Sequence, residues 1–348
     1  MKKIVLNICL LFPLFLCGQG LFESDSILQI TLSGDLKSLM NDRNDQMQEH
    51  PITLIYKGAD SQQVKLNISS RTRGNFRRKI GGCTYPPILL VFPENKSQPN
   101  TLFSEQRKLK LVMPCRGDDY VVKEYMAYRI YNLLTPMSFR ARLVRVTLED
   151  TKKAKLTPPF YGILLEEETQ MAKRNNLVKV ERKMGPRQAE PVSFHRMAVF
   201  EYLIGNTDWS VEYLQNVKLL AKDSMGIAYT VPYDFDHAGL VSAPYARPAD
   251  ELQMSSVRER RYRGFCLPDL SYLDPTFKEF ISIKDQIKSL YESASYLDAG
   301  SKKNALKFID DFYAILNDPQ KIKRDFGYPC DKNGTGNVII GGLKSSNE

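Results

Sequence analysis

The chain has 348 residues, of which 43% are hydrophobic and 26% charged, and it carries a formal net charge of +9. This composition is typical of a globular protein, and the length allows one large domain or two lobes. The positive charge would suit an anionic partner. The basic residues are spread along the chain, however, and no helix-turn-helix, zinc-finger or RNA-binding motif is present, so we expect no nucleic-acid binding.

Residues 1–20 have the pattern of a secretory signal. Two lysines precede an apolar run that ends at Leu16, and small residues follow at Gly18 and Gly20. Such a segment is too short to span a bilayer as a stable helix, and no later segment reaches membrane-spanning length. We therefore expect an exported protein, periplasmic or extracellular. A lipoprotein anchored through Cys17 is a less favoured alternative, because the three preceding residues fit lipidation poorly.

Four cysteines remain after the signal: Cys83, Cys115, Cys266 and Cys330. An even number in an exported chain favours disulfide bonds. The positions suggest Cys83 with Cys115 and Cys266 with Cys330, although the sequence does not fix the pairing and four buried thiols are the alternative. A zinc site is not expected, because there is no Cys-x-x-Cys and the three histidines are far apart in the chain.

We predict a strand-rich first lobe over residues 21–165. A short helix is expected near Asp35, and a longer helix with one apolar stripe is expected to begin at Asp118. Strand patterns cover residues 27–32, 52–56, 64–68, 88–92, 108–112, 141–148 and 160–165.

We predict a mainly helical second lobe over residues 166–330, followed by a flexible tail at residues 331–348. Three glutamates at residues 166–168 are expected to begin a helix or lie near a hinge, with no part in catalysis. A polar connector, a helix ending near residue 204, a hairpin and two late helices are expected at residues 179–191, 197–204, 217–231, 277–291 and 306–316.

Acidic and amide side chains occur at three places in this second lobe. Asp208 follows the helix before Gly205, Asn216 begins the hairpin, and Asp234 and Asp236 follow its second strand. Phosphoryl transfer needs a carboxylate that orients the attacking hydroxyl, and oxygen ligands that hold Mg²⁺ against the phosphates. We therefore interpret the set as a phosphoryl-transfer site. The alternative is a simple helix-terminal turn followed by carboxylates that cap a loop or pair with arginines.

The first lobe supplies candidate cations for a nucleotide. Lys108 and Lys110 share one face of a predicted strand, and Glu124 lies on the next helix, so Lys110 paired with Glu124 is our first choice. An exposed strand lysine is the alternative. Arg73, together with Arg71, is a further candidate phosphate contact. The Gly-rich loop of ordinary protein kinases and the Walker A sequence are both absent.

Longer stretches of the chain resemble the spore-coat CotH kinase-like family, in an uncharacterised exported bacterial branch. The resemblance covers residues 27–330. It rests on Arg71-Thr72-Arg73-Gly74, Lys108-Leu109-Lys110-Leu111-Val112, Phe200-Glu201-Tyr202-Leu203-Ile204-Gly205-Asn206-Thr207-Asp208, Asn216-Val217-Lys218-Leu219 and Pro232-Tyr233-Asp234-Phe235-Asp236. It implies an α+β, bilobal atypical protein-kinase-like fold with a strand-rich N-lobe and a mainly helical C-lobe. It also implies the cofactors ATP and Mg²⁺.

The resemblance further implies a role for each matching residue. Asp208 matches the family's catalytic Asp and Asp234 its metal-binding Asp, with Asn216 as a second ligand and Asp236 supporting it or binding the metal. One departure concerns residues 209–215, where the loop is longer than in typical members and lacks their histidine.

The sequence thus predicts an exported, Mg²⁺-dependent kinase that transfers a phosphoryl group from ATP to a hydroxyl of an envelope protein or glycan. The alternative is a catalytically inactive binding or scaffold protein of the envelope, since ATP is scarce outside the cytoplasm. A metal-dependent hydrolase is a weaker third option. The oligomeric state and the nucleotide preference are left open by the sequence.

Overall fold

The structure is a computed structural model that describes residues 20–58, 60–74, 76–79, 83–93, 101–115, 117–336 and 338. The predicted signal, apart from Gly20, and the predicted lipidation site Cys17 lie outside the described residues. Most of the predicted tail, residues 337 and 339–348, lies outside them as well. In the part of the chain that is described, no helix is long and apolar enough to cross a membrane.

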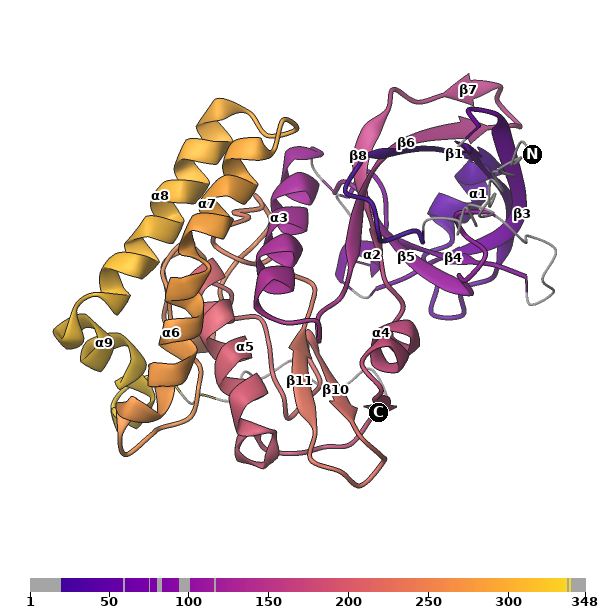
Figure 1. Cartoon of the computed structure of the whole chain (residues 1–348). Helices are drawn as coiled ribbons and strands as arrows, with labels where there is room; N and C mark the ends of the chain where they lie inside the picture. The colour runs from indigo at the N-terminus through magenta and orange to yellow at the C-terminus, as the bar shows by residue number, and fades with distance from the viewer. Residues whose placement is uncertain are drawn as a thin grey trace, which may run out of the picture.

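Among the described residues, the first sheet closes on itself as a barrel of seven strands (Figure 1). The ring runs β1-β2-β3-β4-β5-β8-β6, and β1 closes it by pairing antiparallel with β2 and parallel with β6. The short β7 extends the sheet beyond β6. The strands are β1 (Leu28–Gly34), β2 (His50–Lys57), β3 (Gln63–Thr72), β4 (Ile88–Val91), β5 (Lys108–Val112), β6 (Ala141–Asp150), β7 (Lys155–Leu156) and β8 (Phe160–Leu165).

The predicted bilobal kinase-like fold is therefore wrong, although strands form at nearly all of the predicted places. The error comes from the closure of the sheet, which places Leu28 beside Val144 and Gly34 beside Asp150. Alternating hydrophobicity identifies a strand and its buried face, but it carries no information on which distant strand becomes its neighbour. The sequence patterns of the β1 and β6 segments gave no indication that these two strands pair in parallel.

Helices dominate the chain after the barrel, and α3 stands between the barrel and α7 (Figure 1). A smaller sheet, ordered β11-β10-β9, lies beside α5. The α-helices are α1 (Leu36–Asn41), α2 (Phe76–Lys79), α3 (Asp119–Leu134), α4 (Glu168–Arg174), α5 (Pro191–Ile204), α6 (Asp274–Ser282), α7 (Lys284–Ser293), α8 (Ala299–Leu316) and α9 (Pro319–Phe326). The remaining elements are β9 (Val178–Val180), β10 (Val217–Ala221), β11 (Tyr229–Pro232) and the 3₁₀ helices Pro186–Gln188, Asp250–Leu252, Leu270–Leu273 and Tyr328–Cys330.

Two local predictions need correction. The helix expected over residues 277–291 is two helices, α6 and α7, which meet at Ile283. The connector expected from residue 179 begins inside β9, which pairs antiparallel with β10. A lysine flanked by two valines has too little alternation to stand out as a strand, because the strand is only three residues long.

The apolar side chains form two main clusters. One fills the barrel and includes Leu32, Leu54 and Leu111, all fully buried. The other joins α3 to the later helices and includes Met126 and Phe200. Burying a large apolar side chain stabilises the fold by about 1.5–3 kcal/mol, so both clusters contribute heavily. The boundary placed between residues 165 and 166 stays a prediction, because α3 shares the second cluster.

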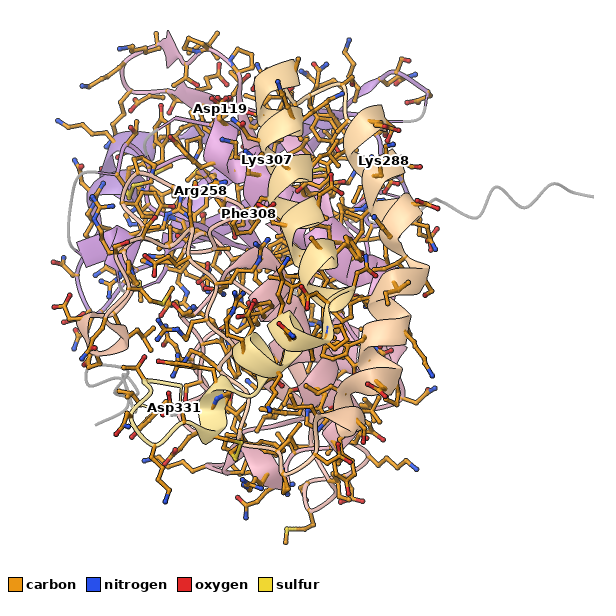
Figure 2. The ribbon with its side chains drawn as sticks, turned by 90° about the vertical axis from the view of Figure 1, so that its left-hand side faces the viewer. Asp119, Arg258, Lys288, Lys307, Phe308 and Asp331 are labelled. Atoms are coloured by element: carbon orange, nitrogen blue, oxygen red, sulfur yellow. A yellow bond between two sulfur atoms is a disulfide. The ribbon has the colours of Figure 1, made fainter. Side chains whose placement is uncertain are left out.

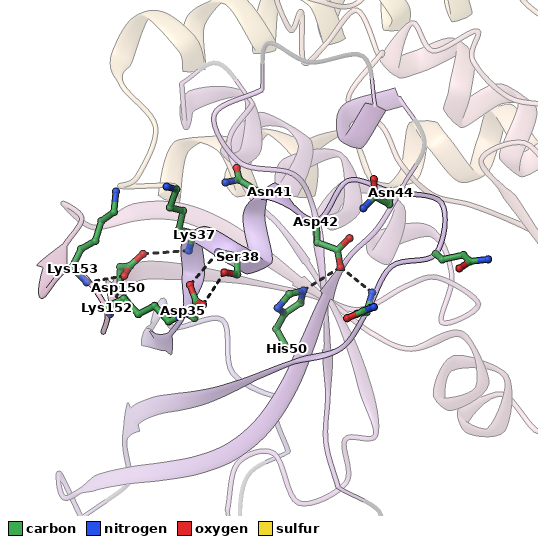
Figure 3. Close-up of a pocket in the computed structure, with 12 residues that line it drawn as sticks. Asp35, Lys37, Ser38, Asn41, Asp42, Asn44, His50, Asp150, Lys152 and Lys153 are labelled. Carbon is green, nitrogen blue, oxygen red and sulfur yellow. Dashed lines mark hydrogen bonds and ion pairs between the residues drawn. The ribbon is translucent and has the colours of Figure 1, made fainter.

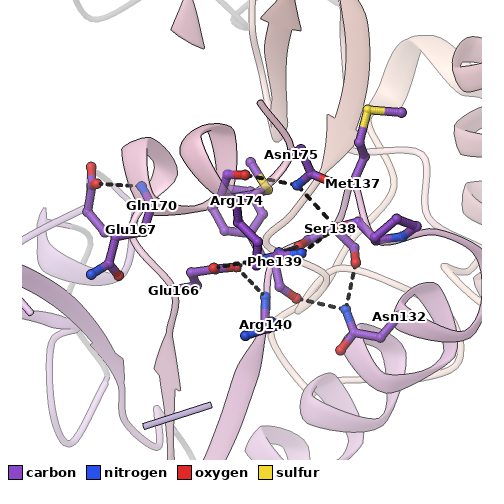
Figure 4. A network of polar contacts seen from close by, with 12 residues as sticks. Asn132, Met137, Ser138, Phe139, Arg140, Glu166, Glu167, Gln170, Arg174 and Asn175 are labelled. Atoms are coloured by element: carbon purple, nitrogen blue, oxygen red, sulfur yellow. Dashed lines mark hydrogen bonds and ion pairs between the residues drawn. The ribbon is translucent and has the colours of Figure 1, made fainter. Parts of the chain in front are cut away.

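A polar network around Glu166 fixes α4 against the end of the barrel (Figure 4). The Glu166 carboxylate accepts hydrogen bonds from Arg174 at 3.0 and 2.9 Å and from the backbone N–H of Arg140 at 3.0 Å. Arg174 also donates to the carbonyl of Ser138 at 2.9 Å. Because Glu166 is buried, these bonds are needed to offset its desolvation. The network sets the position of Glu168, the first residue of α4.

The described residues form two disulfides, Cys83–Cys115 and Cys266–Cys330. The pairing suggested by the sequence is confirmed. The second bond joins residues 64 apart in the chain, and it ties the segment between β11 and α6 to the 3₁₀ helix Tyr328–Cys330. Disulfides limit the freedom of the unfolded chain, and they form in oxidising compartments, which is consistent with an exported protein.

Candidate active site

The loop that carries Asp208 begins with a sharp turn at the end of α5. Gly205 has a φ of 68°, and its N–H bonds to the carbonyl of Tyr202 at 3.1 Å. A Cβ at this position would lie 3.0 Å from the ring of Phe308, so glycine suits both the backbone angle and the space. The helix-terminal turn considered from the sequence is thus real. It also turns the chain so that Asp208 emerges half-buried beside the hairpin.

Asn216 links this loop to the base of the hairpin. Its side-chain amide donates to the backbone carbonyl of Asp208 at 2.7 Å and to the Asp208 carboxylate at 3.1 Å. The backbone carbonyl of Asn216 accepts a hydrogen bond from the N–H of Tyr233 at 3.0 Å, and Tyr233 is the residue immediately before Asp234. Asn216 and Asp234 have φ values of 51° and 65°. Backbone pairing therefore brings Asp208, Asn216 and Asp234, from three separate segments, to one end of the hairpin.

The surroundings raise the pKa of Asp208. Burial is the main cause, and the negative charge of Asp234 adds to it, whereas His237 and the Asn216 amide act in the opposite direction. A carboxyl whose pKa is raised toward neutrality binds a proton more readily than an ordinary aspartate. This is the property expected of a general base that works near neutral pH.

A second set of acidic residues lies around the loop after β11. The N–H of Asp234 donates to the hydroxyl of Tyr128 at 2.9 Å, and Asp236 accepts from the hydroxyl of Tyr245 at 3.0 Å. Glu124 of α3 is buried beside these acids. Burial raises the pKa of Glu124 well above its usual range, and Asp236 and Asp234 raise it further. These surroundings therefore favour the protonated form of Glu124.

These acids fit a divalent cation in charge and in donor type. One carboxylate oxygen of Glu124 is buried and has no hydrogen-bond partner among the described residues. A hard cation such as Mg²⁺ prefers carboxylate and amide oxygens, and its charge would favour the ionised forms of Glu124, Asp234 and Asp236. No group of three or more His, Cys, Asp or Glu residues in the described part of the chain is already arranged to hold a metal. The ligand set Asn216, Asp234 and Asp236 stays a prediction.

Positive charge also acts on Asp234, from Arg73, Arg77 and Lys110. The Lys110 ammonium lies 4.8 Å from the centre of the Tyr233 ring, and the Lys218 ammonium lies 5.4 Å from the same ring. Burial lowers the pKa of Lys110 to about 7, and the nearby charges of Arg73 and Lys218 contribute to this shift. Three cations close enough to disfavour one another are suited to an anion with several charges, such as a nucleotide phosphate chain.

The predicted ion pair between Lys110 and Glu124 does not form among the described residues. The charges that act on Glu124 are those of Asp236, Asp234 and Arg77. Arg77 is buried in α2 and donates to the carbonyl of Met113. The prediction assumed the strand-to-helix pairing of a kinase-like lobe, which the closed barrel does not provide. Lys108 is exposed two residues before Lys110, and no hydrogen bond or ion pair joins it to the other described candidates.

Glu168 is a candidate site residue that the sequence did not suggest. Its carboxylate lies 3.2 Å from the ammonium of Lys218 and 3.6 Å from that of Lys179. We expected the glutamates at 166–168 to begin a helix or lie near a hinge, with no part in catalysis. One signal was available for Lys218, which interrupts an apolar strand directly after Asn216. A charged residue within an apolar strand indicates a functional site or a buried ion pair.

Arg263 holds the backbone on both sides of Asp208. Its guanidinium donates to the carbonyl of Thr207 at 2.6 Å and to that of Trp209 at 3.2 Å. The same arginine-rich segment lies against α8, where Arg258 is 5.0 Å from the centre of the Phe308 ring (Figure 2). These arginines act mainly as structural donors to backbone and rings, and Arg263 does so next to the candidate catalytic residue.

Comparisons with known proteins give little further information. The chain matches no protein-family model, and no curated protein matches it. Among solved structures it is similar to the proinflammatory kinase CtkA of Helicobacter pylori, with a TM-score of 0.40 and 14% sequence identity, over 70% of this chain and 93% of that chain. The chain thus has a kinase as a structural neighbour, at a similarity too low to carry an argument about its function.

Proposed function

We propose that the chain is an exported phosphotransferase that moves a phosphoryl group from ATP to a hydroxyl of an envelope protein or glycan, with Mg²⁺ as cofactor. The observation that carries the proposal is the meeting of Asp208, Asn216 and Asp234. Asn216 bonds to the Asp208 carboxylate at 3.1 Å, and the charge of Asp234 acts on that carboxylate. Asp236 and the cations Arg73, Arg77 and Lys110 all act on Asp234, and together they supply the two kinds of charge that phosphoryl transfer requires.

In this proposal Asp208 receives the proton of the acceptor hydroxyl. Its half-buried position and raised pKa suit that role, because a base with a pKa closer to the working pH is more effective. Asn216 orients the carboxylate through its amide. Arg263 and Asn216 together keep the Asp208 backbone in place, so the carboxylate needs little rearrangement before reaction.

The cations would bind the phosphates of the nucleotide. Lys110 and Lys218 face one ring, Glu168 orients Lys218, and Arg73 adds charge at the end of β3. Mg²⁺, when bound, would neutralise charge on the phosphates, and we propose Asn216, Asp234 and Asp236 as the residues that hold it.

A protein that binds a nucleotide without turnover is the second candidate. Two observations favour it. Lys110 and Glu124 form no ion pair, and the described residues contain no preformed group of three metal-binding side chains of the His, Cys, Asp or Glu type. Such a protein would act as a scaffold in the envelope, and its nucleotide would stabilise one conformation.

A thermal-shift titration with ATP and Mg²⁺ tests the proposal, combined with an assay of label transfer from γ-labelled ATP. We expect ATP and Mg²⁺ to raise the melting temperature of the wild type. Asp234→Ala should abolish that rise, and Asp208→Ala should retain it but lose label transfer. Asp310→Ala, which removes an exposed carboxylate on α8, is the matched control. Binding without transfer in the wild type would favour the second candidate, and no effect of nucleotide would contradict both.

A further inference from the structure

Many carboxylates of this protein have hydrogen-bond donors close to them, but Glu201 of α5 differs. In the groove beside α1, for example, Asp150 accepts from the backbone N–H groups of Lys37 and Lys153 at 3.2 and 3.0 Å (Figure 3). Glu201 is fully buried, and its two carboxylate oxygens have neither a cation nor a backbone N–H as a partner within the described part of the chain. Burying a carboxyl group in this way is costly, so its presence in α5 needs an explanation.

Packing does not explain this glutamate. Its neighbours in α5 include Phe200, Leu203 and Ile204, all of which are fully buried in the apolar cluster that joins the helices. An apolar side chain would suit the same surroundings without the cost of desolvating a carboxyl group. The role of Glu201 must therefore lie in what its oxygens contact.

The polar side chain next to Glu201 is that of Asn206, in the turn after α5. The backbone N–H of Asn206 donates to the backbone carbonyl of Glu201 at 2.8 Å, so the turn brings the two residues together. Burial raises the pKa of Glu201, and the Asn206 amide opposes this rise as a hydrogen-bond donor. Nδ2 of Asn206 is itself buried and, apart from Glu201, has no partner within the described residues.

The other end of the same amide supports Asp208. Oδ1 of Asn206 accepts a hydrogen bond from the backbone N–H of Asp208 at 3.1 Å. An asparagine amide has one donor end and one acceptor end, so a partner for Nδ2 also decides where Oδ1 points. Glu201 is thus linked to the candidate catalytic base through a single side chain.

We propose that Glu201 is a positioning residue for Asp208. Its carboxyl group accepts a hydrogen bond from Nδ2 of Asn206, and this bond keeps Oδ1 of Asn206 against the N–H of Asp208. Burial favours the protonated form of the carboxyl group, which still offers an acceptor oxygen and adds no negative charge near Asp208. The consequence for catalysis rests on the proposed phosphotransferase function, whereas the support of the Asp208 backbone does not.

Hydrogen exchange of the Asp208 amide, followed by NMR in the full chain, tests the proposal without depending on activity. Glu201→Leu fills the space but removes the acceptor, so exchange at Asp208 should become at least fivefold faster. Glu201→Gln keeps an acceptor oxygen and should exchange as the wild type does. Thr230→Val, the matched control, removes a buried hydroxyl that has no hydrogen-bond partner among the described residues. The N–H of Leu240, which bonds to the carbonyl of Ile204 at 2.9 Å, should keep its exchange rate in every variant.

In the label-transfer assay, Glu201→Leu should lower kcat about tenfold with little change in the KM for ATP, and Glu201→Gln should keep the wild-type kcat. Unchanged exchange at Asp208 in Glu201→Leu would overturn the proposal. Equal acceleration at Leu240, the same behaviour of the Leu and Gln variants, or an unchanged kcat in Glu201→Leu would overturn it as well. If the wild type transfers no label but exchange at Asp208 changes as expected, the proposed function fails and the positioning role stands.

Discussion

The side-chain amide of Asn216 donates to both the backbone carbonyl and the carboxylate of Asp208, at 2.7 and 3.1 Å. Asp208 lies in the loop after α5, whereas Asn216 immediately precedes β10. The paired bonds therefore join a helix end to a hairpin, and they aim one carboxylate oxygen of Asp208. They also oppose the effect of burial on the Asp208 pKa.

Removal of this amide should change how activity depends on pH. Asn216→Ala takes away a donor that favours the charged carboxylate, so the pKa of Asp208 should rise further and Asp208 should be protonated at higher pH. A base is active only when deprotonated, so the acidic limb of the kcat/KM profile should move to higher pH. The rate on the acidic side of the profile should fall severalfold, because a hydrogen bond to a charged group contributes about 1.5–3 kcal/mol. Asn304→Ala on the exposed face of α8 is the control, and an unmoved acidic limb would contradict the prediction.

Binding of ATP without metal should weaken as pH rises through about 7. The pKa of Lys110 is lowered to about 7, so its ammonium is charged below that pH and largely neutral above it. An anion binds the charged form better. The dissociation constant should therefore increase severalfold between pH 6 and pH 8.5 in the wild type, measured by fluorescence anisotropy of a labelled ATP analogue. Lys110→Met should bind weakly with a flatter profile, while Lys108→Met should keep the wild-type profile. A profile in Lys110→Met as steep as that of the wild type would count against this role.

The elements of the fold were more predictable than their arrangement. The strand containing Leu54 and the helix containing Met126 were correctly expected, because alternation and helical spacing report burial within a short segment. The pairing of Leu28 with Val144 could not be expected in this way. This pairing depends on the twist and closure of the whole sheet, which the residues of a single segment do not determine.

The candidate site shows the same division. Asp208, Asn216 and Asp234 were chosen from the sequence, and the structure brings them together because each lies at the end of a recognisable element. Lys110 is close to them, but its expected partner Glu124 instead lies among acids. Glu168 was missed because its contact with Lys218 depends on where α4 sits against the small sheet. Such contacts between elements require the three-dimensional packing.

The buried Glu201 should make the protein less stable as pH rises. Burial raises the pKa of Glu201 well above the ordinary 4.5. The folded state therefore keeps a proton that the unfolded chain releases above pH 4.5, and the free energy of unfolding should fall by about 1.4 kcal/mol per pH unit until pH passes the folded pKa. The Glu201→Gln side chain does not ionise, so this variant lacks the pH-dependent loss of stability. Its stability advantage in urea denaturation should grow from pH 4.5 to pH 7.5. An advantage that stayed constant with pH would show that Glu201 is not the cause, and exposed Glu212→Gln provides the baseline.

The last prediction concerns the support of Asp208 by Arg263. One guanidinium nitrogen donates to the backbone carbonyls of Thr207 and Trp209, at 2.6 and 3.2 Å, and so bridges the two residues that flank Asp208. The pKa of Arg263 is lowered by burial only to about 10, so the side chain stays charged at neutral pH. Lysine keeps the charge but lacks the planar, rigid donor arrangement. Arg263→Lys should therefore let the Asp208 loop move.

We expect kcat to fall about tenfold in Arg263→Lys, while the affinity for ATP changes little, because misplacement of a reacting group affects the rate more than binding. Arg261→Lys is the matched control. Arg261 belongs to the same segment but bonds to the carbonyl of Leu252 at 3.2 Å and to the hydroxyl of Tyr328 at 2.9 Å. Both variants should lose some thermal stability, but only Arg263→Lys should lose turnover. Equal losses of kcat in the two variants would mean that the arginine segment supports the fold in general and has no particular role at Asp208.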